Sequence, residues 1–227
     1  ASLTGIIPPS GSAVMSAHQL THLPSLAKTL KRHGYTCVGM HGNSGKFWNR
    51  SDAYEQLGFD AFMDQEYYSG RARGFNTLDH LFLRQSLDHL EQLQKQKRPF
   101  LAYLITNSTH IPFSMAAHVN PVEYDLEDKL ALNYFRAANY TDKSIKLFFK
   151  GIKEQGLLEN TVFILYGDHN SDVFTEEYNC GKANGENVPL FIRLPGKESE
   201  INPVFGGHLD LAPTVLDIAG IPRDAEM

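Results

Sequence analysis

The sequence predicts an α/β fold in which a mostly parallel sheet is sandwiched between helices. Two observations carry this prediction: segments with apolar residues three or four positions apart alternate with short apolar runs, and those runs are continuously apolar. Strands that are buried on both faces of a parallel sheet have such sequences, whereas half-exposed strands alternate apolar and polar residues. The composition, with 42% hydrophobic and 21% charged residues, is typical of a globular domain. A layered core of the α/β type is therefore expected.

Helical periodicity marks five segments, several of which end at a glycine. The clearest is 125–155, where apolar residues recur every three or four positions along one face. Gly34, Gly156 and Gly220 follow the first, fourth and last segments, and glycine is common just beyond a helix end. Asp210 is expected to cap the last helix. The predicted helices are 23–32, 46–57, 77–96, 125–155 and 211–219.

Short apolar runs between these helices are predicted to be strands. The strongest is 100–106, which is followed directly by polar residues. None of the runs approaches the roughly 18 apolar residues that a membrane span requires. The predicted strands are 35–40, 59–63, 100–106, 161–166 and 189–194.

Charge, cysteine content and length narrow the class of protein. The chain has 21 Lys and Arg against 26 Asp and Glu, a net charge of −5, which argues against binding nucleic acid through its phosphates. Cys37 and Cys180 do not make a disulfide framework or a zinc site, and Cys37 is expected to be buried. The 227 residues are predicted to form one domain, 1–227. Because the chain has no initiator methionine and opens on a turn-like stretch, we expect a fragment of a longer protein.

Polar clusters after three strands are the candidate site, because ligands of open α/β sheets lie beyond the carboxyl ends of the strands. The sharpest cluster is Asp168-His169, which directly follows an apolar strand and Gly167. A carboxylate oxygen and an imidazole nitrogen suit Zn²⁺ or Mn²⁺. The alternative is a solvated turn in which Asp168 caps a helix.

The other two clusters suit an anionic ligand. After strand 100–106, His110 is placed to donate to a phosphate or sulfate oxygen; the alternative is a capping or buried histidine. After strand 35–40, His41 is followed by Trp48 and Arg50, and an arginine beside a tryptophan suits an anionic group on an apolar or polyol body. The alternative there is a core tryptophan and a surface arginine. Taken together, three polar strand ends in one sheet favour an anionic substrate bound at a metal.

Six short motifs occur in an order that resembles one known family. They are Met40-His41-Gly42, Phe47-Trp48-Asn49-Arg50, Leu57-Gly58-Phe59-Asp60, Thr109-His110-Ile111-Pro112-Phe113, Tyr166-Gly167-Asp168-His169 and Leu209-Asp210-Leu211-Ala212-Pro213-Thr214. In this order they resemble the lipoteichoic acid synthase group, which are phosphoglycerol transferases of the sulfatase-like branch of the alkaline phosphatase superfamily. The resemblance covers most of the chain and implies an alkaline phosphatase/sulfatase-like fold that is N-terminally incomplete here.

The resemblance also implies the roles of individual residues. Asp168 and His169 match the Asp-His ligands of a divalent cation, Mn²⁺ foremost, with Zn²⁺ or Mg²⁺ as alternatives. The residues that match head-group-binding positions are His41, Asn43, Trp48, Arg50 and His110, with Asn43 standing where the family often has Asp. The family's nucleophilic Thr and metal-binding Glu lie N-terminal to the matched region. The chain is therefore expected to contain no catalytic nucleophile and to be inactive alone.

The implied reaction is metal-dependent transfer of a phosphoglycerol head group from phosphatidylglycerol to a cell-envelope polymer or glycan. The implied location is the extracellular or periplasmic face of the cell membrane, with the tether in transmembrane helices absent from this chain. Two alternatives remain: a sulfatase or phosphoethanolamine-type transferase with the same metal site, and a non-catalytic module that binds anionic head groups.

Overall fold

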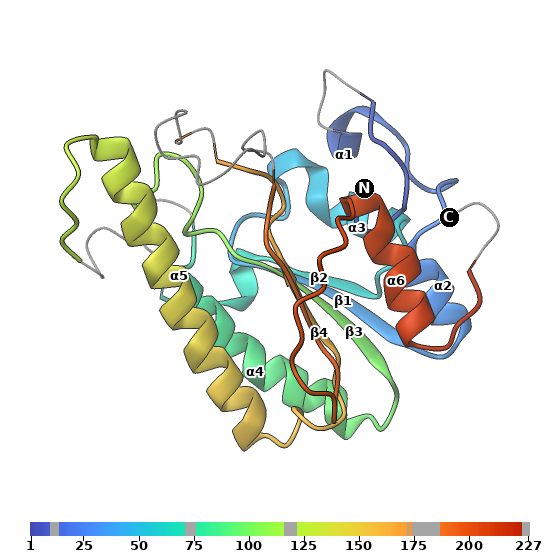
Figure 1. Cartoon of the computed structure of the whole chain (residues 1–227). Coiled ribbons are helices and arrows are strands. Elements are labelled where there is room, and N and C mark those ends of the chain that lie inside the picture. Colours follow the sequence, from blue (N-terminus) through green and yellow to red (C-terminus); the bar gives the residue numbers. More distant parts are fainter. Residues whose placement is uncertain (10–13, 71–75, 116–121, 172, 174–186, 224–227) are drawn as a thin grey trace. The chain divides into compact units, whose positions relative to one another are not determined.

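A computed structural model describes the chain apart from residues 10–13, 71–75, 116–121, 172, 174–186 and 224–227 (Figure 1). Cys180 lies outside the described residues. The chain forms two compact units, the first made of residues 1–107 and 204–227 and the second of residues 108–203. Among the described residues, no helix is long and apolar enough to cross a membrane.

The first unit is built on a three-stranded parallel sheet. Its strands are β1 (Thr36–His41), β2 (Ala61–Met63) and β3 (Phe100–Ile105), in the order β2-β1-β3. In the register of this sheet, Thr36 lies opposite Phe100 and His41 opposite Ile105, so β1 and β3 end at the same level. The three strands confirm the apolar runs that the sequence marked and the parallel direction expected for them.

Helices cover both faces of this sheet. Alternate side chains of β1 and β3 pack against α2 (Leu26–Arg32), α3 (Arg50–Gln56) and α6 (Leu211–Ile218), whereas α4 (Asp79–Lys95) contacts both strands from the other face (Figure 1). A short helix, α1 (Val14–Ala17), lies against α3. The α/β class with helices on both faces of a parallel sheet is confirmed.

Two local predictions are corrected in this unit. The predicted helix 46–57 is α-helical only from Arg50, because a 3-10 turn at Phe47–Asn49 with left-handed backbone precedes it. Asp210 does not cap α6 with its side chain. It belongs to a 3-10 turn, and its carboxylate accepts a hydrogen bond from the Gly207 N–H at 2.7 Å instead.

The second unit contains the longest helix and a separate pair of strands. Helix α5 (Lys129–Glu154) begins where the Asp128 carboxylate accepts hydrogen bonds from two backbone N–H groups of the first turn, and it ends before Gly156, which has a φ of +69°. Strands β4 (Phe163–Tyr166) and β5 (Leu190–Arg193) pair antiparallel in a sheet of their own. Among the described residues β4 pairs with β5, and the expectation that all three polar clusters follow strands of one sheet stays a prediction.

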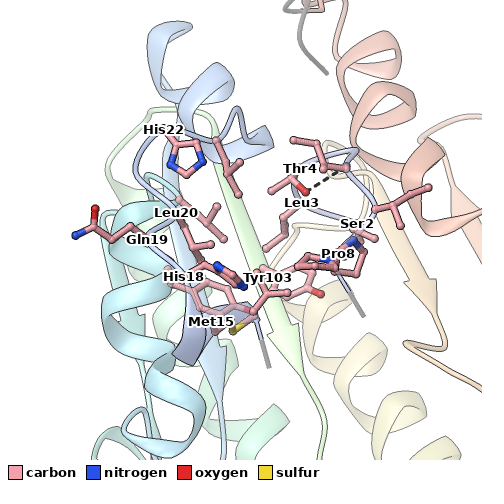
Figure 2. Close-up of a pocket in the computed structure, with 18 residues that line it drawn as sticks. Ser2, Leu3, Thr4, Pro8, Met15, His18, Gln19, Leu20, His22 and Tyr103 are labelled. Carbon is pink, nitrogen blue, oxygen red and sulfur yellow. Dashed lines mark hydrogen bonds between the residues drawn. The ribbon is translucent and has the colours of Figure 1, made fainter. Parts of the chain in front are cut away.

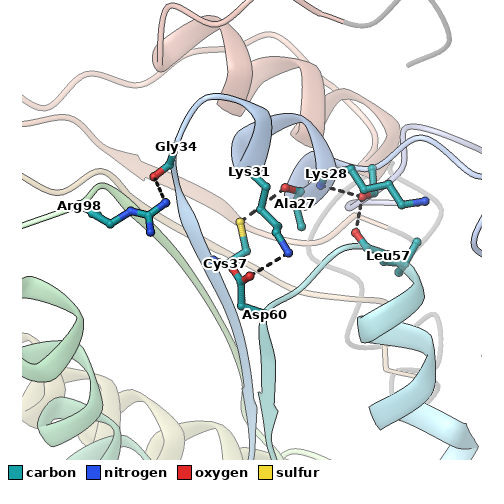
Figure 3. Close-up of polar contacts among 9 residues, drawn as sticks. Ala27, Lys28, Lys31, Gly34, Cys37, Leu57, Asp60 and Arg98 are labelled. Carbon is teal, nitrogen blue, oxygen red and sulfur yellow. Dashed lines mark hydrogen bonds and ion pairs between the residues drawn. The ribbon is translucent and has the colours of Figure 1, made fainter. Parts of the chain in front are cut away.

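Asp60 joins three elements at the amino end of β1 (Figure 3). Its Oδ2 accepts the Cys37 N–H at 2.8 Å, and its Oδ1 pairs with the Lys31 Nζ at 2.8 Å. Cys37 is fully buried, as predicted, and burial, followed by the Asp60 charge, raises the pKa of its thiol to about 12. Partial burial by itself raises the pKa of the Asp60 carboxyl, but the Cys37 N–H, Lys31 and Arg98 outweigh it and hold that pKa below its usual value.

Replacing Asp60 with Asn should destabilise the protein in a pH-dependent way. A carboxyl whose pKa is depressed by folding adds stability above its unfolded pKa of about 3.9, and that stability is lost as the pH falls through the folded value. We expect Asp60→Asn to lower the free energy of unfolding by about 1 kcal/mol at pH 7, since a charged hydrogen bond is worth more but this group is partly exposed. The difference should shrink below about pH 4.

Urea unfolding at the two pH values measures this effect. Asp125→Asn is the matched control, because the Asp125 side chain is exposed. A stability difference for Asp60→Asn that stays the same at low pH would contradict the proposed role of the charge.

Candidate functional site

The carboxyl ends of β1 and β3 are held together by buried polar contacts. His41, the last residue of β1, is 2% exposed, and its Nδ1–H donates to the Ile105 carbonyl at 2.8 Å. Next along the chain, the Gly42 carbonyl accepts the Thr77 N–H at 2.7 Å. A side chain at Gly42 would approach the Thr77 carbonyl to 3.0 Å, so glycine is needed for this close packing. These contacts hold the backbone rigidly where the chain leaves β1 and β3.

Asp79 is a buried carboxylate at this edge that the sequence reading placed only within a helix. It is fully buried at the start of α4, and its Oδ1 accepts the Asn107 N–H at 2.8 Å. This bond fixes the chain where it leaves β3, ahead of the segment that carries His110. An aspartate next to a helix start is the sequence signal that could have drawn attention to it.

The loop after β1 is tied to the chain that follows β2. Gly45 donates its N–H to the Asp64 Oδ2 at 2.8 Å, and Gln65 donates its N–H to the Asn43 carbonyl at 3.1 Å. The Asn43 side-chain oxygen accepts the Ser44 N–H. With its oxygen used locally, the Asn43 amide nitrogen is the atom that can donate to a ligand.

Phe47, Trp48 and Arg50 form a compact aromatic and cationic cluster on this loop. The Arg50 guanidinium carbon lies 5.1 Å from the Phe47 ring centre and 5.4 Å from that of Trp48, and Nη1 donates to the Phe47 carbonyl at 3.3 Å. Burial lowers the pKa of Arg50, yet a guanidinium remains charged at neutral pH. Trp48 is 52% exposed, so the alternative of a core tryptophan is wrong.

Two consecutive left-handed residues create this cluster. Trp48 has a φ of 55° and Asn49 a φ of 54°, a conformation that is unfavourable for residues other than glycine and less so for asparagine. The turn places both rings and the guanidinium together just before α3 begins. Backbone strain of this kind is common at binding sites, where the surrounding structure holds it in place.

His110 and the pair Asp168 and His169 lie in the second unit. The His110 side chain is exposed, which rules out a buried histidine, and its Nδ1–H donates to the Ile111 carbonyl at 2.7 Å. That bond leaves Nε2 as the ring atom for a ligand; it accepts from the neutral ring and donates only from the protonated one.

Asp168 and His169 suit a divalent cation in donor type and geometry. The His169 Nδ1–H donates to the Asn170 carbonyl at 2.6 Å, so the Nε2 lone pair is available, and Nε2 lies 3.8 Å from the Asp168 Oδ2. Two ligands of a tetrahedral site lie about 3.4 Å apart. Within the described part of the chain, no group of three or more His, Cys, Asp or Glu side chains could hold a metal. That Asp168 and His169 bind a metal together with further ligands stays a prediction.

The structure thus gathers the predicted residues in two groups. His41, Asn43, Trp48 and Arg50 follow β1 in the first unit, and His110, Asp168 and His169 lie in the second. The joining of the two groups in one site stays a prediction.

The first unit also contains an apolar cavity of about 490 Å³ that the sequence did not predict (Figure 2). Figure 2 shows Leu3, Met15 and Leu20 around it, with Tyr103 of β3 at its floor. None of the predicted site residues lines it. Most of its lining comes from the N-terminal segment, which carries no regular apolar pattern, and the rest from Tyr54, Leu57 and Tyr103, so only the folded chain reveals it.

The fold and these side chains define an α/β domain with cationic and aromatic groups beyond the carboxyl edge of a parallel sheet. The chain belongs to the sulfatase family, whose model matches residues 1–221. It is 34% identical to lipoteichoic acid synthase 1 of Bacillus subtilis over 230 residues, which cover 94% of this chain and 35% of that protein. The chain thus spans about a third of the length of this curated relative.

Solved structures agree with this assignment. The crystal structure of the lipoteichoic acid synthase LtaP from Listeria monocytogenes matches with a TM-score of 0.86 and 29% identity, covering 97% of this chain and 58% of that one. The Streptococcus pyogenes phosphoglycerol transferase GacH, in complex with sn-glycerol-1-phosphate, shares the fold with a TM-score of 0.69 at 17% identity, over 95% of this chain and 59% of that one. The predicted alkaline phosphatase/sulfatase-like fold and the resemblance to lipoteichoic acid synthases are confirmed.

Substitutions at Asn49 should test the left-handed turn that shapes the cluster. Alanine is disfavoured in this conformation by roughly 1–2 kcal/mol, whereas glycine adopts it freely. We expect Asn49→Ala to lower the free energy of unfolding by about 1 kcal/mol, and Asn49→Gly to leave it within a few tenths of a kcal/mol. Chemical unfolding of both variants measures the difference, and equal losses in the two would contradict a left-handed Asn49.

Proposed function

We propose that this chain is part of a metal-dependent transferase that moves a phosphoglycerol head group from an anionic lipid such as phosphatidylglycerol. The observation that supports this most directly is the Arg50 guanidinium held against the Phe47 and Trp48 rings at the carboxyl edge of the sheet. A fixed guanidinium beside an exposed flat ring matches a head group that has a phosphate at one end and a small polyol at the other.

In this proposal the first unit binds the head group. Arg50 donates to two phosphoryl oxygens with the N–H groups that face away from Phe47, and it stabilises the negative charge there. Trp48 packs its ring against the glycerol carbons, and Asn43 donates its amide hydrogens to a glycerol hydroxyl. His41 holds the start of the loop after β1 through its hydrogen bond to the Ile105 carbonyl.

The second unit supplies His110 and the metal ligands Asp168 and His169. His110, when protonated, donates Nε2–H to a phosphoryl oxygen. Asp168 and His169 would hold a divalent cation, Mn²⁺ foremost with Zn²⁺ or Mg²⁺ as alternatives; such a cation polarises a phosphoryl oxygen and lowers the pKa of a bound hydroxyl. The remaining metal ligand and the nucleophilic threonine are proposed to lie outside these 227 residues.

The proposed location and partners are inferred from the similarity to lipoteichoic acid synthases. The proposed enzyme works at the extracellular or periplasmic face of the cell membrane and passes the phosphoglycerol group to an envelope polymer or glycan. Its membrane tether is proposed to lie in segments outside this chain.

Membership of the sulfatase family supports a second candidate, hydrolysis of a sulfate ester or transfer of phosphoethanolamine. Sulfate and phosphate esters present similar anionic oxygens to Arg50, so the two candidates differ in the group that Trp48 and Asn43 contact. A third candidate is a non-catalytic module that binds anionic head groups at the same residues. Comparing the binding of glycerol phosphate with that of a sulfate ester or ethanolamine phosphate distinguishes the first two candidates. Activity of a longer protein that carries the nucleophile would exclude the third.

Binding of glycerol phosphate should be visible at Trp48, the one tryptophan of the chain. We expect sn-glycerol-1-phosphate to change its fluorescence, and Arg50→Ala to weaken this binding on the order of 10–100-fold, the value of a charge-assisted hydrogen bond. Arg98→Ala is the control, because Arg98 is exposed at the opposite end of β3, where it donates to the Gly34 carbonyl. A response that is equal for Arg50→Ala, or stronger for a sulfate ester or ethanolamine phosphate, would contradict the proposed substrate.

Metal binding should be weak and should depend on Asp168 and His169. Two ligands are about half of a closed set, so we expect Mn²⁺ to bind the chain only weakly, with loss of binding in Asp168→Ala combined with His169→Ala. Loss of the free Mn²⁺ signal in electron paramagnetic resonance measures binding, and His33→Ala, at an exposed histidine, is the control. Tight stoichiometric binding that survives the double substitution would show that the metal site lies elsewhere.

A further inference from the structure

The second unit has a groove in which basic and apolar side chains alternate, and no role proposed above uses it. The groove lies between the C-terminal half of α5 and β5 and encloses about 530 Å³. Lys146, Lys150 and Lys153 line it from the helix and Arg193 from the strand. Leu147 lies among the lysines and is 62% exposed. We call these five residues the basic groove.

Helix geometry explains how the three lysines come together. Positions 146, 150 and 153 are separated by four and three residues, which places them on one face of α5. At about 1.5 Å per residue they span roughly 10 Å along the helix axis. The face that packs into the unit is a different one and carries Tyr140, Ser144 and Ile152, all buried.

The charge of the basic groove is opposite to that of the whole chain. Four cations meet there, whereas the chain carries a net charge of −5. Glu154 approaches Lys150 at 3.9 Å, but both side chains are exposed, so this pair is weak. A lysine near a helix C-terminus also stabilises the helix dipole, and this explains Lys153 alone. Arg193 donates a hydrogen bond to the Leu158 carbonyl, which fixes its charge at the groove. Neither effect explains the exposed leucine among these cations.

We propose that the basic groove docks on the surface of an anionic lipid bilayer. Cationic side chains around an exposed apolar one match such a surface, because the lysines meet the phosphate groups while the leucine enters the interface. Leu158 and Phe149 add apolar surface to the lining of the groove. A soluble polyanion would match the four charges but would leave Leu147 in water.

The inference goes beyond the proposed transferase and does not need its active site. The groove lies in the second unit, and the proposed head-group residues His41, Asn43, Trp48 and Arg50 lie in the first. Binding of the chain to vesicles and the response of Trp48 to glycerol phosphate are therefore separate measurements. Loss of the Trp48 response with intact vesicle binding would overturn only the proposed function.

Flotation with vesicles tests the proposal. We expect the chain to float with vesicles of phosphatidylcholine mixed with phosphatidylserine, an anionic lipid without a glycerol head group, to float poorly with phosphatidylcholine alone, and to detach in high salt. Each lysine close to an anionic surface is worth about fivefold in binding, so Lys146→Gln, Lys150→Gln and Lys153→Gln together should weaken it about 100-fold. Leu147→Ser should weaken binding to both kinds of vesicle.

The matched control removes the same charge elsewhere. Lys97→Gln, Lys129→Gln and Lys197→Gln replace three exposed lysines outside the basic groove and should cost at most a few-fold through general electrostatics. Circular dichroism checks that α5 stays helical in each variant. Three outcomes would overturn the proposal: equal binding of the groove and control variants, equal flotation of the chain with neutral vesicles, or binding to soluble polyphosphate without binding to vesicles.

Discussion

Backbone pairing between β1 and β3 runs from Thr36 opposite Phe100 to His41 opposite Ile105, and it ends both strands at the same level. Because the strands are parallel, the chain leaves both of them at one edge, and the polar residues that follow gather there. The bond from His41 to the Ile105 carbonyl is possible only in this register. The Asp79 carboxylate fixes the backbone just beyond β3 by accepting the Asn107 N–H. The loops of the first unit therefore start from a rigid edge.

Arg50, which lies on the loop after β1, is held in place by its local contacts. Two left-handed residues cost conformational energy, and in return the guanidinium is held against two rings and a carbonyl before any ligand arrives. A side chain that is already ordered loses less entropy on binding. Hydrogen bonds from Gly45 to Asp64 and from Gln65 to Asn43 hold the loop in this shape.

The second unit follows a different plan. Helix α5 uses one face for packing, and its C-terminal half presents Lys146, Lys150 and Leu147 outward. Strand β4 leads directly into Asp168 and His169, whose exposed side chains point donor atoms toward each other. The proposed metal ligands and the basic groove are made of different residues, so substitutions can address each separately.

The sequence by itself determined the α/β class, the positions of most helices and strands, and the polar residues that follow the strands. These features depend on local periodicity: the apolar spacing of α5 and the continuous apolar run of β3 are visible without any tertiary contact. The motifs around Trp48, Arg50, Asp168 and His169 also sufficed to indicate the family. The sequence could not place Asp79, since a buried carboxylate and a solvent-exposed one look alike in a helix pattern.

Only the tertiary structure decided the rest. The antiparallel pairing of β4 with β5 depends on which distant segments meet, and an apolar run has the same sequence in either direction. The left-handed residues Trp48 and Asn49 interrupt the helix that the local pattern predicted from residue 46. The cap predicted at Asp210 is replaced by a local contact, because the 3-10 turn that holds Asp210 directs its carboxylate to the Gly207 N–H. The pairing of β4 with β5 joins segments far apart in the sequence, and both turns depend on backbone conformations that the apolar pattern does not encode, so only the folded chain shows them.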